Sequence, residues 1–174
     1  MHIMLDNETL GTTARSVIMS VGLVKFDPAT GIIEPGIEVF PSVEEQVKAG
    51  RTISDSTVRW WLDQSSEARS SISKSYPISC KEAISKINYY ASETNFLWSN
   101  GADFDIPALI SLMEDFGMEP SWSFRAHRCY RTYAHCKGFS KKEPAHSALE
   151  DAIIQTKAII GHLKEDEYFR YRFK

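Results

Sequence analysis

Several features that would assign a protein class directly are scarce or missing in this sequence. Only three cysteines occur among 174 residues and no two form a C-x-x-C pair, which argues against a disulfide framework or a cysteine-based zinc site. No apolar run approaches the roughly 20 residues that a membrane-spanning helix needs, and the N-terminus lacks the charged and apolar regions of a signal peptide. We therefore expect free thiols and a cytoplasmic protein without a membrane partner.

An excess of positive charge is also missing. The sequence has 20 Lys and Arg against 23 Asp and Glu, which gives a formal net charge of −3. Proteins that coat long stretches of duplex usually carry a basic excess, because phosphate contacts dominate their affinity. A nucleic-acid partner would therefore be bound locally, over a few bases at an end.

The pattern of apolar residues predicts an α/β domain that opens with strands. Segments 2–6, 16–26 and 32–40 are separated by turns, which predicts an antiparallel meander, and 95–99 is apolar enough for a further buried strand. Neither a repeat nor a linker occurs, so residues 1–174 are expected to form a single domain. Helical spacing or capping signals predict helices at 43–49, 54–64, 79–91, 106–116 and 121–136, and a last helix from Ser147.

The first candidate site lies at the end of the first predicted strand. Asp6 and Glu8 are two residues apart, and side chains with that spacing share one face of a strand. Two carboxylates on one face repel each other unless a divalent cation lies between them, and Mg²⁺ prefers carboxylate oxygens. The alternative is that the strand ends here in a polar turn.

Two further carboxylates lie where helices are expected to begin. Asp105 precedes a proline by two residues, and since proline is tolerated only in the first turn, Asp105 is placed at or next to the N-cap. Ser147 and Glu150 fit a capping box, which leaves His146 outside the last helix and Asp151 in its first turn. Each acid alone is also a favourable helix-capping residue without any catalytic role.

Taken in order, these segments resemble the DEDDh 3′–5′ exonucleases, the group that contains proofreading subunits, RNase T and oligoribonuclease. The family carries D-x-E, N-x-x-F-D and H-x-A-x-x-D. The stretches MLDNETLGT, WSNGADFD, RCYRT and HSALEDA are similar to its phage and prophage branch, which is related to the mycobacterial RNase AS type. The resemblance covers nearly the whole chain. The matching motifs are Asp6-Asn7-Glu8, Asn100-Gly101-Ala102-Asp103-Phe104-Asp105 and His146-Ser147-Ala148-Leu149-Glu150-Asp151.

The middle motif departs from the commonest family form. One residue is inserted between Asn100 and Phe104, so two aspartates are candidates for the family's third acid. The Phe-Asp pair makes Asp105 the expected metal ligand and Asp103 a bystander.

The resemblance implies an RNase H-like fold, in which helices flank both faces of a mixed five-stranded sheet whose first three strands are antiparallel. Sequence patterns alone supply only four of these strands. We expect the fifth near 123–127, inside the segment 121–136 that spacing predicts as helical.

The resemblance also implies a reaction. A metal-dependent exonuclease of this type hydrolyses phosphodiester bonds at the 3′ end of single-stranded RNA or DNA and releases nucleoside 5′-monophosphates. Two ions, Mg²⁺ or Mn²⁺, would be held by Asp6, Glu8, Asp105 and Asp151, with Asp6 bridging both. His146 would act as the general base, because an unperturbed histidine titrates near neutral pH.

Candidate substrate contacts lie near these motifs. Trp60 and Trp61 point about 100° apart on a helix, so one can pack in the core while the other lines a groove where bases stack; the alternative for the second is plain packing. Arg128 and Arg131 are three apart and are expected to share a helix face that holds phosphate, although a solvated face is the alternative. The expected set is Thr9, Trp61, Asn100, Arg128 and Arg131.

Two other functional classes remain open. A non-catalytic nucleic-acid-binding module on this fold would be expected to have lost one of the acids. An RNase H-like endonuclease would lack the last motif. The expected partner is a single-stranded 3′ end; a homodimer is left open, and the relation to RNase AS favours RNA while the phage branch is compatible with DNA.

Overall fold

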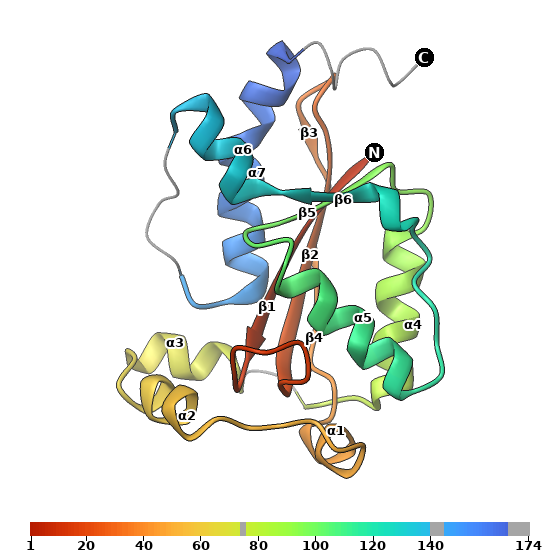
Figure 1. Cartoon of the computed structure of the whole chain (residues 1–174). Coiled ribbons are helices and arrows are strands. Elements are labelled where there is room, and N and C mark those ends of the chain that lie inside the picture. Colours follow the sequence, from red (N-terminus) through yellow and green to blue (C-terminus); the bar gives the residue numbers. More distant parts are fainter. Residues whose placement is uncertain (74–75, 140–144, 167–174) are drawn as a thin grey trace.

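The structure, a computed structural model, describes residues 1–73, 76–139 and 145–166 (Figure 1). Its strands are β1 (His2–Thr9), β2 (Ile18–Asp27), β3 (Ile32–Ile33), β4 (Ile37–Val39), β5 (Phe96–Ser99) and β6 (His127–Cys129). Its helices are α1 (Val43–Lys48), α2 (Asp55–Leu62), α3 (Ser66–Ser71), α4 (Cys80–Ala91), α5 (Asp105–Asp115), the 3-10 helix η1 (Phe124–Ala126), α6 (Tyr130–Lys137) and α7 (Ala148–Glu165).

The strands form one mixed sheet in the order β3-β2-β1-β5-β6, with β4 also paired to β2. β1 runs antiparallel to β2, whereas β5 is parallel to β1 and β6 is parallel to β5. β3 and β4 share the edge of β2 that β1 leaves open, so the strands occupy five positions. The mixed sheet with an antiparallel start is therefore confirmed.

The third predicted strand, 32–40, is interrupted at 34–36. Pro35 has no N–H to donate to the ladder. A Cβ on Gly36 would lie 2.8 Å from the carbonyl oxygen of Leu23 on β2 and 2.5 Å from a methyl group of Leu149 on α7. The backbone at Gly36 lies so close to β2 and α7 that a residue with a side chain would not fit there.

The prediction of one helix over 121–136 is wrong. The segment divides into η1, β6 and the start of α6, and β6 supplies the fifth strand position. Pairing with β5, which is distant in sequence, outweighs the helical spacing of the arginines. The other predicted helices are present, and α3 follows α2 where no element was predicted.

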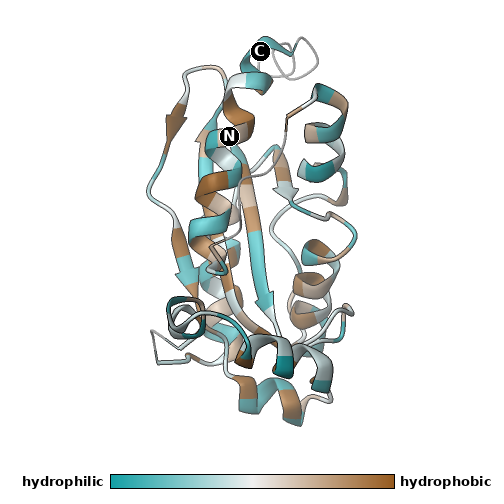
Figure 2. Ribbon diagram, turned by 90° about the vertical axis from the view of Figure 1, so that its left-hand side faces the viewer, coloured by the Kyte–Doolittle hydropathy of each residue, from teal (hydrophilic) through white to brown (hydrophobic). Residues whose placement is uncertain are grey.

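Each face of the sheet buries its own cluster of apolar side chains. Along β1, Ile3 and Leu5 pack with α4 and α5, and Met4 packs with α6 and α7 on the opposite face. Hydrophobic and hydrophilic residues alternate along the covering helices, as Figure 2 shows. Continuing the alternation, Asp6 and Glu8 lie on the α7 face and Asn7 on the α5 face.

The cysteines and the lengths of the helices were also the subject of sequence-based expectations. Cys80, Cys129 and Cys136 are all free, as predicted. Within the described ranges, no helix has the length and apolar character required to cross a bilayer.

Candidate active site

Asp6 and Glu8 lie inside β1 rather than at its end. The strand continues to Thr9, past the predicted boundary, and pairs with β2 throughout, with a register irregularity between Glu8 and Thr9. The polar-turn alternative is therefore wrong, and both carboxylates stand on one face of a strand.

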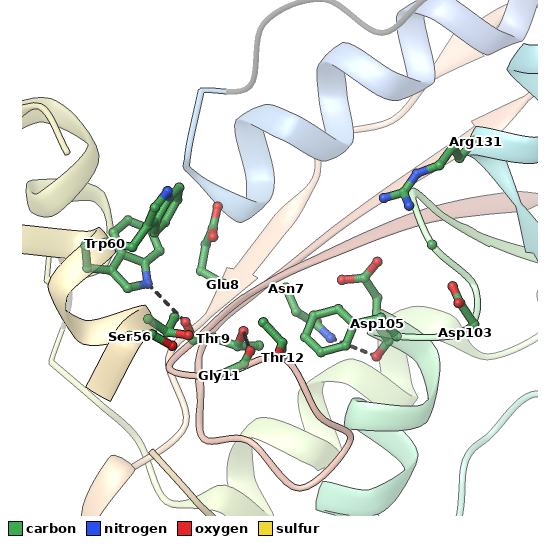
Figure 3. A pocket seen from close by; sticks show the side chains of 14 residues that line it. Asn7, Glu8, Thr9, Gly11, Thr12, Ser56, Trp60, Asp103, Asp105 and Arg131 are labelled. Carbon is green, nitrogen blue, oxygen red and sulfur yellow. Dashed lines mark hydrogen bonds between the residues drawn. The ribbon is translucent and has the colours of Figure 1, made fainter. Parts of the chain in front are cut away.

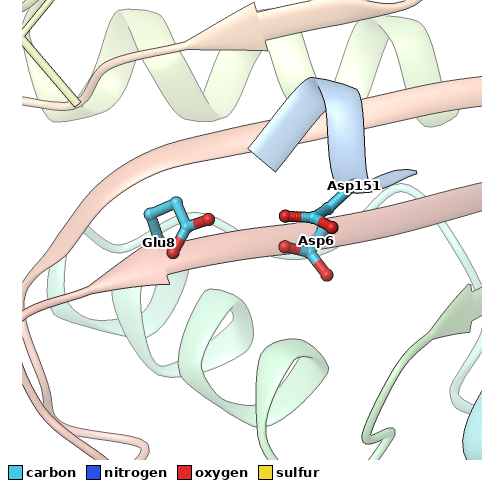
Figure 4. Close-up of side chains that lie close together, drawn as sticks. All are labelled: Asp6, Glu8 and Asp151. Carbon is cyan, nitrogen blue, oxygen red and sulfur yellow. The ribbon is translucent and has the colours of Figure 1, made fainter. Parts of the chain in front are cut away.

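Asp151 completes a group of three carboxylates. Oxygen atoms of Asp6, Glu8 and Asp151 all lie within 4.8 Å of one another (Figure 4). The first turn of α7 reaches this position because Gly22, the β2 residue opposite Asp6, has no side chain. A Cβ on Gly22 would lie only 2.3 Å from the carbonyl carbon of Ala148.

The predicted capping box at the start of α7 is wrong. Ser147 is the N-cap residue, but within the described chain its side chain makes no capping hydrogen bond, and Glu150 is exposed. The backbone N–H of Ala145 instead donates to Oδ1 of Asp151 at 3.2 Å. The site carboxylate itself therefore ties the entering loop to the helix.

Asp105 approaches from the opposite side of β1. It is the first residue of α5, next to the N-cap as predicted, and is buried. Nδ2 of Asn7 donates to the Asp105 carbonyl oxygen at 2.8 Å, which attaches the start of α5 to β1 (Figure 3). Sequence analysis missed this role of Asn7, although strand alternation places it on the α5 face.

Gln155 is a second residue that sequence analysis missed. Its Nε2 donates to Oδ1 of Asp6 at 2.8 Å in a buried environment. Gln155 lies four residues after Asp151 and thus one turn further along the same face of α7. The four-residue spacing from Asp151 could have identified Gln155 from the sequence.

The environment of Asp6 disfavours its negative charge. The residue is 9% exposed. Burial raises the pKa of Asp6 well above its usual value, and the nearby Asp105 and Glu8 raise it further, while the Gln155 hydrogen bond acts in the opposite direction.

The donor set fits a hard divalent cation. It offers carboxylate oxygens from three side chains within 4.8 Å, with neither histidine nor cysteine in the group. A bound cation would also offset the burial and the repulsion between carboxylates that raise the pKa of Asp6. Asp105 lies outside this group but close enough to raise the pKa of Asp6, so it could hold a second ion together with Asp6.

A cavity of about 680 Å³ adjoins the carboxylates; Glu8 and Asp105 line it, whereas Asp6 and Asp151 are not among the described residues that do. Glu8 and Asp105 line its middle, Trp60 stands at one end, and Arg131 and Asp103 stand at the other (Figure 3). The cavity therefore offers an aromatic surface, a set of acids and a guanidinium group in succession.

The two tryptophans have different environments. Trp61 is 4% exposed, and its Nε1 donates to the Thr9 carbonyl oxygen at 3.0 Å, which attaches α2 to the end of β1. Trp60 is 43% exposed. Both rings and Thr9 line the cavity, but the broad free surface belongs to Trp60 rather than to the expected Trp61.

His146 lies beside the tryptophan end of the cavity. Its ring is edge-to-face with Trp60 at a centroid distance of 5.1 Å, and its backbone has a positive φ of 55°. The hydroxyl of Ser71 donates to its carbonyl oxygen. Among the described residues, His146 is not one that lines the cavity.

The remaining residues expected to contact the substrate do not lie together. Arg131, on α6, lines the cavity, whereas Arg128 lies on β6 with its guanidinium 4.3 Å from the centre of the Phe96 ring. The predicted shared helix face is therefore wrong. Asn100 begins the turn after β5 and, in the part of the chain that is described, does not line the cavity.

Comparison with known proteins agrees with this geometry. The model of the 3′–5′ exoribonuclease Rv2179c-like domain matches residues 1–161. An exodeoxyribonuclease of Enterobacteria phage T4 is 30% identical over 125 residues, which cover 64% of this chain and 55% of the phage protein.

Solved structures share the fold at low sequence identity. The nuclease domain of 3′hExo, a DEDDh family member bound to rAMP, has a TM-score of 0.60 at 12% identity and covers 94% of this chain and 92% of that domain. E. coli exonuclease I in complex with a dA16 oligonucleotide has a TM-score of 0.66 at 15% identity, covering 99% of this chain and 42% of that one. The chain thus spans about half the length of the phage protein and of exonuclease I. It belongs to the family of 3′–5′ exoribonuclease Rv2179c-like domains.

Proposed function

We propose that the chain hydrolyses the 3′-terminal phosphodiester bond of single-stranded nucleic acid and releases nucleoside 5′-monophosphates. The observation that carries this proposal is the group formed by Asp6, Glu8 and Asp151 next to a cavity large enough for a nucleotide, which Glu8 and Asp105 line. Family membership supports the reaction and its 3′–5′ direction.

Each acid has a place in the proposed site. Glu8 and Asp151 would hold one divalent cation with Asp6, and Asp105 would hold a second with Asp6. Mg²⁺ or Mn²⁺ bound there would supply an activated water and neutralise charge on the phosphate oxygens. Gln155 and Asn7 keep Asp6 and the start of α5 in position through their hydrogen bonds.

His146 is the proposed general base. A histidine that reaches the attacking water can accept its proton. Because its ring packs against Trp60 in this structure, the role requires the side chain to turn toward Asp151.

The ends of the cavity suggest how the substrate lies. The 3′-terminal base would stack on the exposed face of Trp60, and such a contact contributes about 1–3 kcal/mol in single-strand binders. Arg131, at the other end, would hold a phosphate on the 5′ side of the cleaved bond. The acids between them then face the terminal phosphodiester.

Digestion of matched RNA and DNA single strands carrying a 5′ label tests the proposal. With Mg²⁺ or Mn²⁺ the labelled products should shorten progressively from the 3′ end, and a 3′-phosphate should slow the reaction. Comparison of the two strands decides the sugar preference, for which the family description favours RNA and the phage relative DNA.

Each other outcome of that digest contradicts a defined part of the proposal. Internal cuts would indicate an endonuclease, absence of products would indicate a binding module, and early release of the labelled nucleotide would reverse the direction. Full activity in excess chelator would refute the dependence on metal.

A further inference from the structure

A second polar cavity, of about 300 Å³, lies at the end of β5 and β6 that is remote from the acids. Arg125 and Arg128 both line it, together with the polar residues Thr94, Asn95 and Ser123. No carboxylate is among the lining residues that the structure describes. Two guanidinium groups at one cavity without an acid indicate a site for an anion.

Arg128 is held in position for such a ligand. Its guanidinium lies over the Phe96 ring, and its Nη1 donates to the carbonyl oxygens of Arg125 at 2.8 Å and His127 at 2.7 Å. Within the described ranges, neither Nε nor Nη2 of Arg128 donates a hydrogen bond. An oriented guanidinium with free donors matches the paired oxygens of a phosphate.

The charges of this cavity are not balanced internally. Neither Arg125 nor Arg128 forms an ion pair with a residue that the structure describes, whereas Arg15 and Arg51 both pair with Asp115. At the same cavity, Oγ1 of Thr94 is buried without a hydrogen-bond partner in the described chain. A phosphate oxygen would satisfy this hydroxyl as well as the arginines.

The position of the cavity connects it to the catalytic one. β6 is the edge strand of the sheet, with Arg128 on it, Arg125 just before it and Arg131 just after it. Phe96 and Ser99 are the first and last residues of β5, so about 10 Å of strand separates the second cavity from the turn that leads to Asp105. A few nucleotides of an extended strand would cover this distance.

We propose that Arg125 and Arg128 form a distal phosphate site for the 5′ part of the strand whose 3′ end occupies the catalytic cavity. The ligand is a backbone phosphate rather than a whole nucleotide, because Arg128 covers the only aromatic ring among the described residues that line the cavity, that of Phe96. This inference rests on the proposed function, since it takes the same strand as its ligand.

Substrate length provides the test. For the wild type, KM should fall as the strand grows from a dinucleotide to a decamer. Arg128→Gln and Arg125→Gln should each raise KM for the decamer about tenfold, the effect of losing a charged hydrogen bond, and leave kcat and the dinucleotide KM unchanged. Each variant should also reduce the salt dependence of decamer binding by roughly 0.7 in log–log slope, the value for one phosphate contact on a single strand.

Two controls separate the site from general effects. Lys81→Gln removes one exposed positive charge from α4 and should leave the decamer KM unchanged. Arg128→Lys keeps the charge and should retain part of the gain with length. Decamer KM values for both Gln variants equal to that of Lys81→Gln would overturn the proposal, as would an equal loss on the dinucleotide.

Direct binding keeps this test independent of catalysis. Fluorescence anisotropy of labelled strands in excess chelator should show tighter binding of the decamer than of the trimer, and Arg128→Gln should abolish the difference. If the wild type proved inactive but kept this difference, the proposed function would fail and the distal site would stand. Equal affinity of the wild type for both lengths would overturn the distal site alone.

Discussion

Removal of the hydrogen bond from Gln155 to Asp6 should weaken cation binding without unfolding the protein. In Gln155→Leu the side chain keeps a similar volume but loses the donor to the Asp6 carboxyl group, and such a bond contributes about 0.5–1.5 kcal/mol to a neutral acceptor and about 1.5–3 kcal/mol to a charged one. The same change removes the buried Gln155 Oε1, which has no hydrogen-bond partner among the described residues and costs about 1–3 kcal/mol. These terms offset each other in the metal-free protein.

The cation-bound protein should show the loss. Side chains that orient a metal ligand typically contribute 10–100-fold in affinity, or about 1.4–2.7 kcal/mol at saturation. For a chain of 174 residues, in the range where 1 kcal/mol shifts Tm by about 2–4 °C, the rise of Tm on adding Mn²⁺ should shrink by about 3–10 °C. Thermal unfolding with and without Mn²⁺ measures this difference.

Thr156→Val is the matched control. Thr156 is the next residue of α7, is fully buried, and has a hydroxyl without a partner in the described part of the chain. Its replacement should leave the Mn²⁺-dependent rise of Tm unchanged. If Gln155→Leu retained the full wild-type rise, the hydrogen bond would have no part in organising the carboxylates.

Three further predictions concern other residues. Asp105→Asn should abolish nuclease activity while Asp103→Asn retains most of it; the reverse result would show that the third acid has been misassigned. Trp60→Ala should raise KM for single strands roughly 5- to 150-fold, the equivalent of one lost base stack, whereas Trp61→Phe should mainly lower Tm because it removes the bond to β1. Burial lowers the pKa of His2 from 6.5 to about 3, so only the unfolded chain gains a proton between these values, and the free energy of unfolding should fall by about 1.4 kcal/mol per pH unit below 6.5. Urea unfolding at decreasing pH measures this fall. The fall should be smaller in His2→Asn; an unchanged fall in that variant would show that another group causes it.

Local periodicity predicted the parts of the site that depend on one element. Asp6 and Glu8 share a face because strand side chains alternate, and Asp105 lies at a helix start because a proline follows it closely. Both conclusions need only the residues nearby.

Contacts between distant segments were not accessible in this way. The strand character of Arg128 depends on pairing with β5, about thirty residues earlier, which no local pattern reports. Spacing showed that Trp60 and Trp61 face different directions, but the rotation of α2 that buries Trp61 is set by its bond to Thr9. The side-chain cap expected at Ser147 failed for the same reason, because the entering loop is bound by Asp151 instead.

Gly22 offers a criterion for sorting related sequences. It lies in the middle of an apolar strand, carries no chemistry, and would pass unnoticed in any search for the four acids. Yet a methyl group at this position would overlap the backbone of α7 and push Asp151 away from Asp6. A related sequence that keeps all four acids but has a larger residue here should therefore be set apart from the active nucleases, since its catalytic side chains would be present without being assembled.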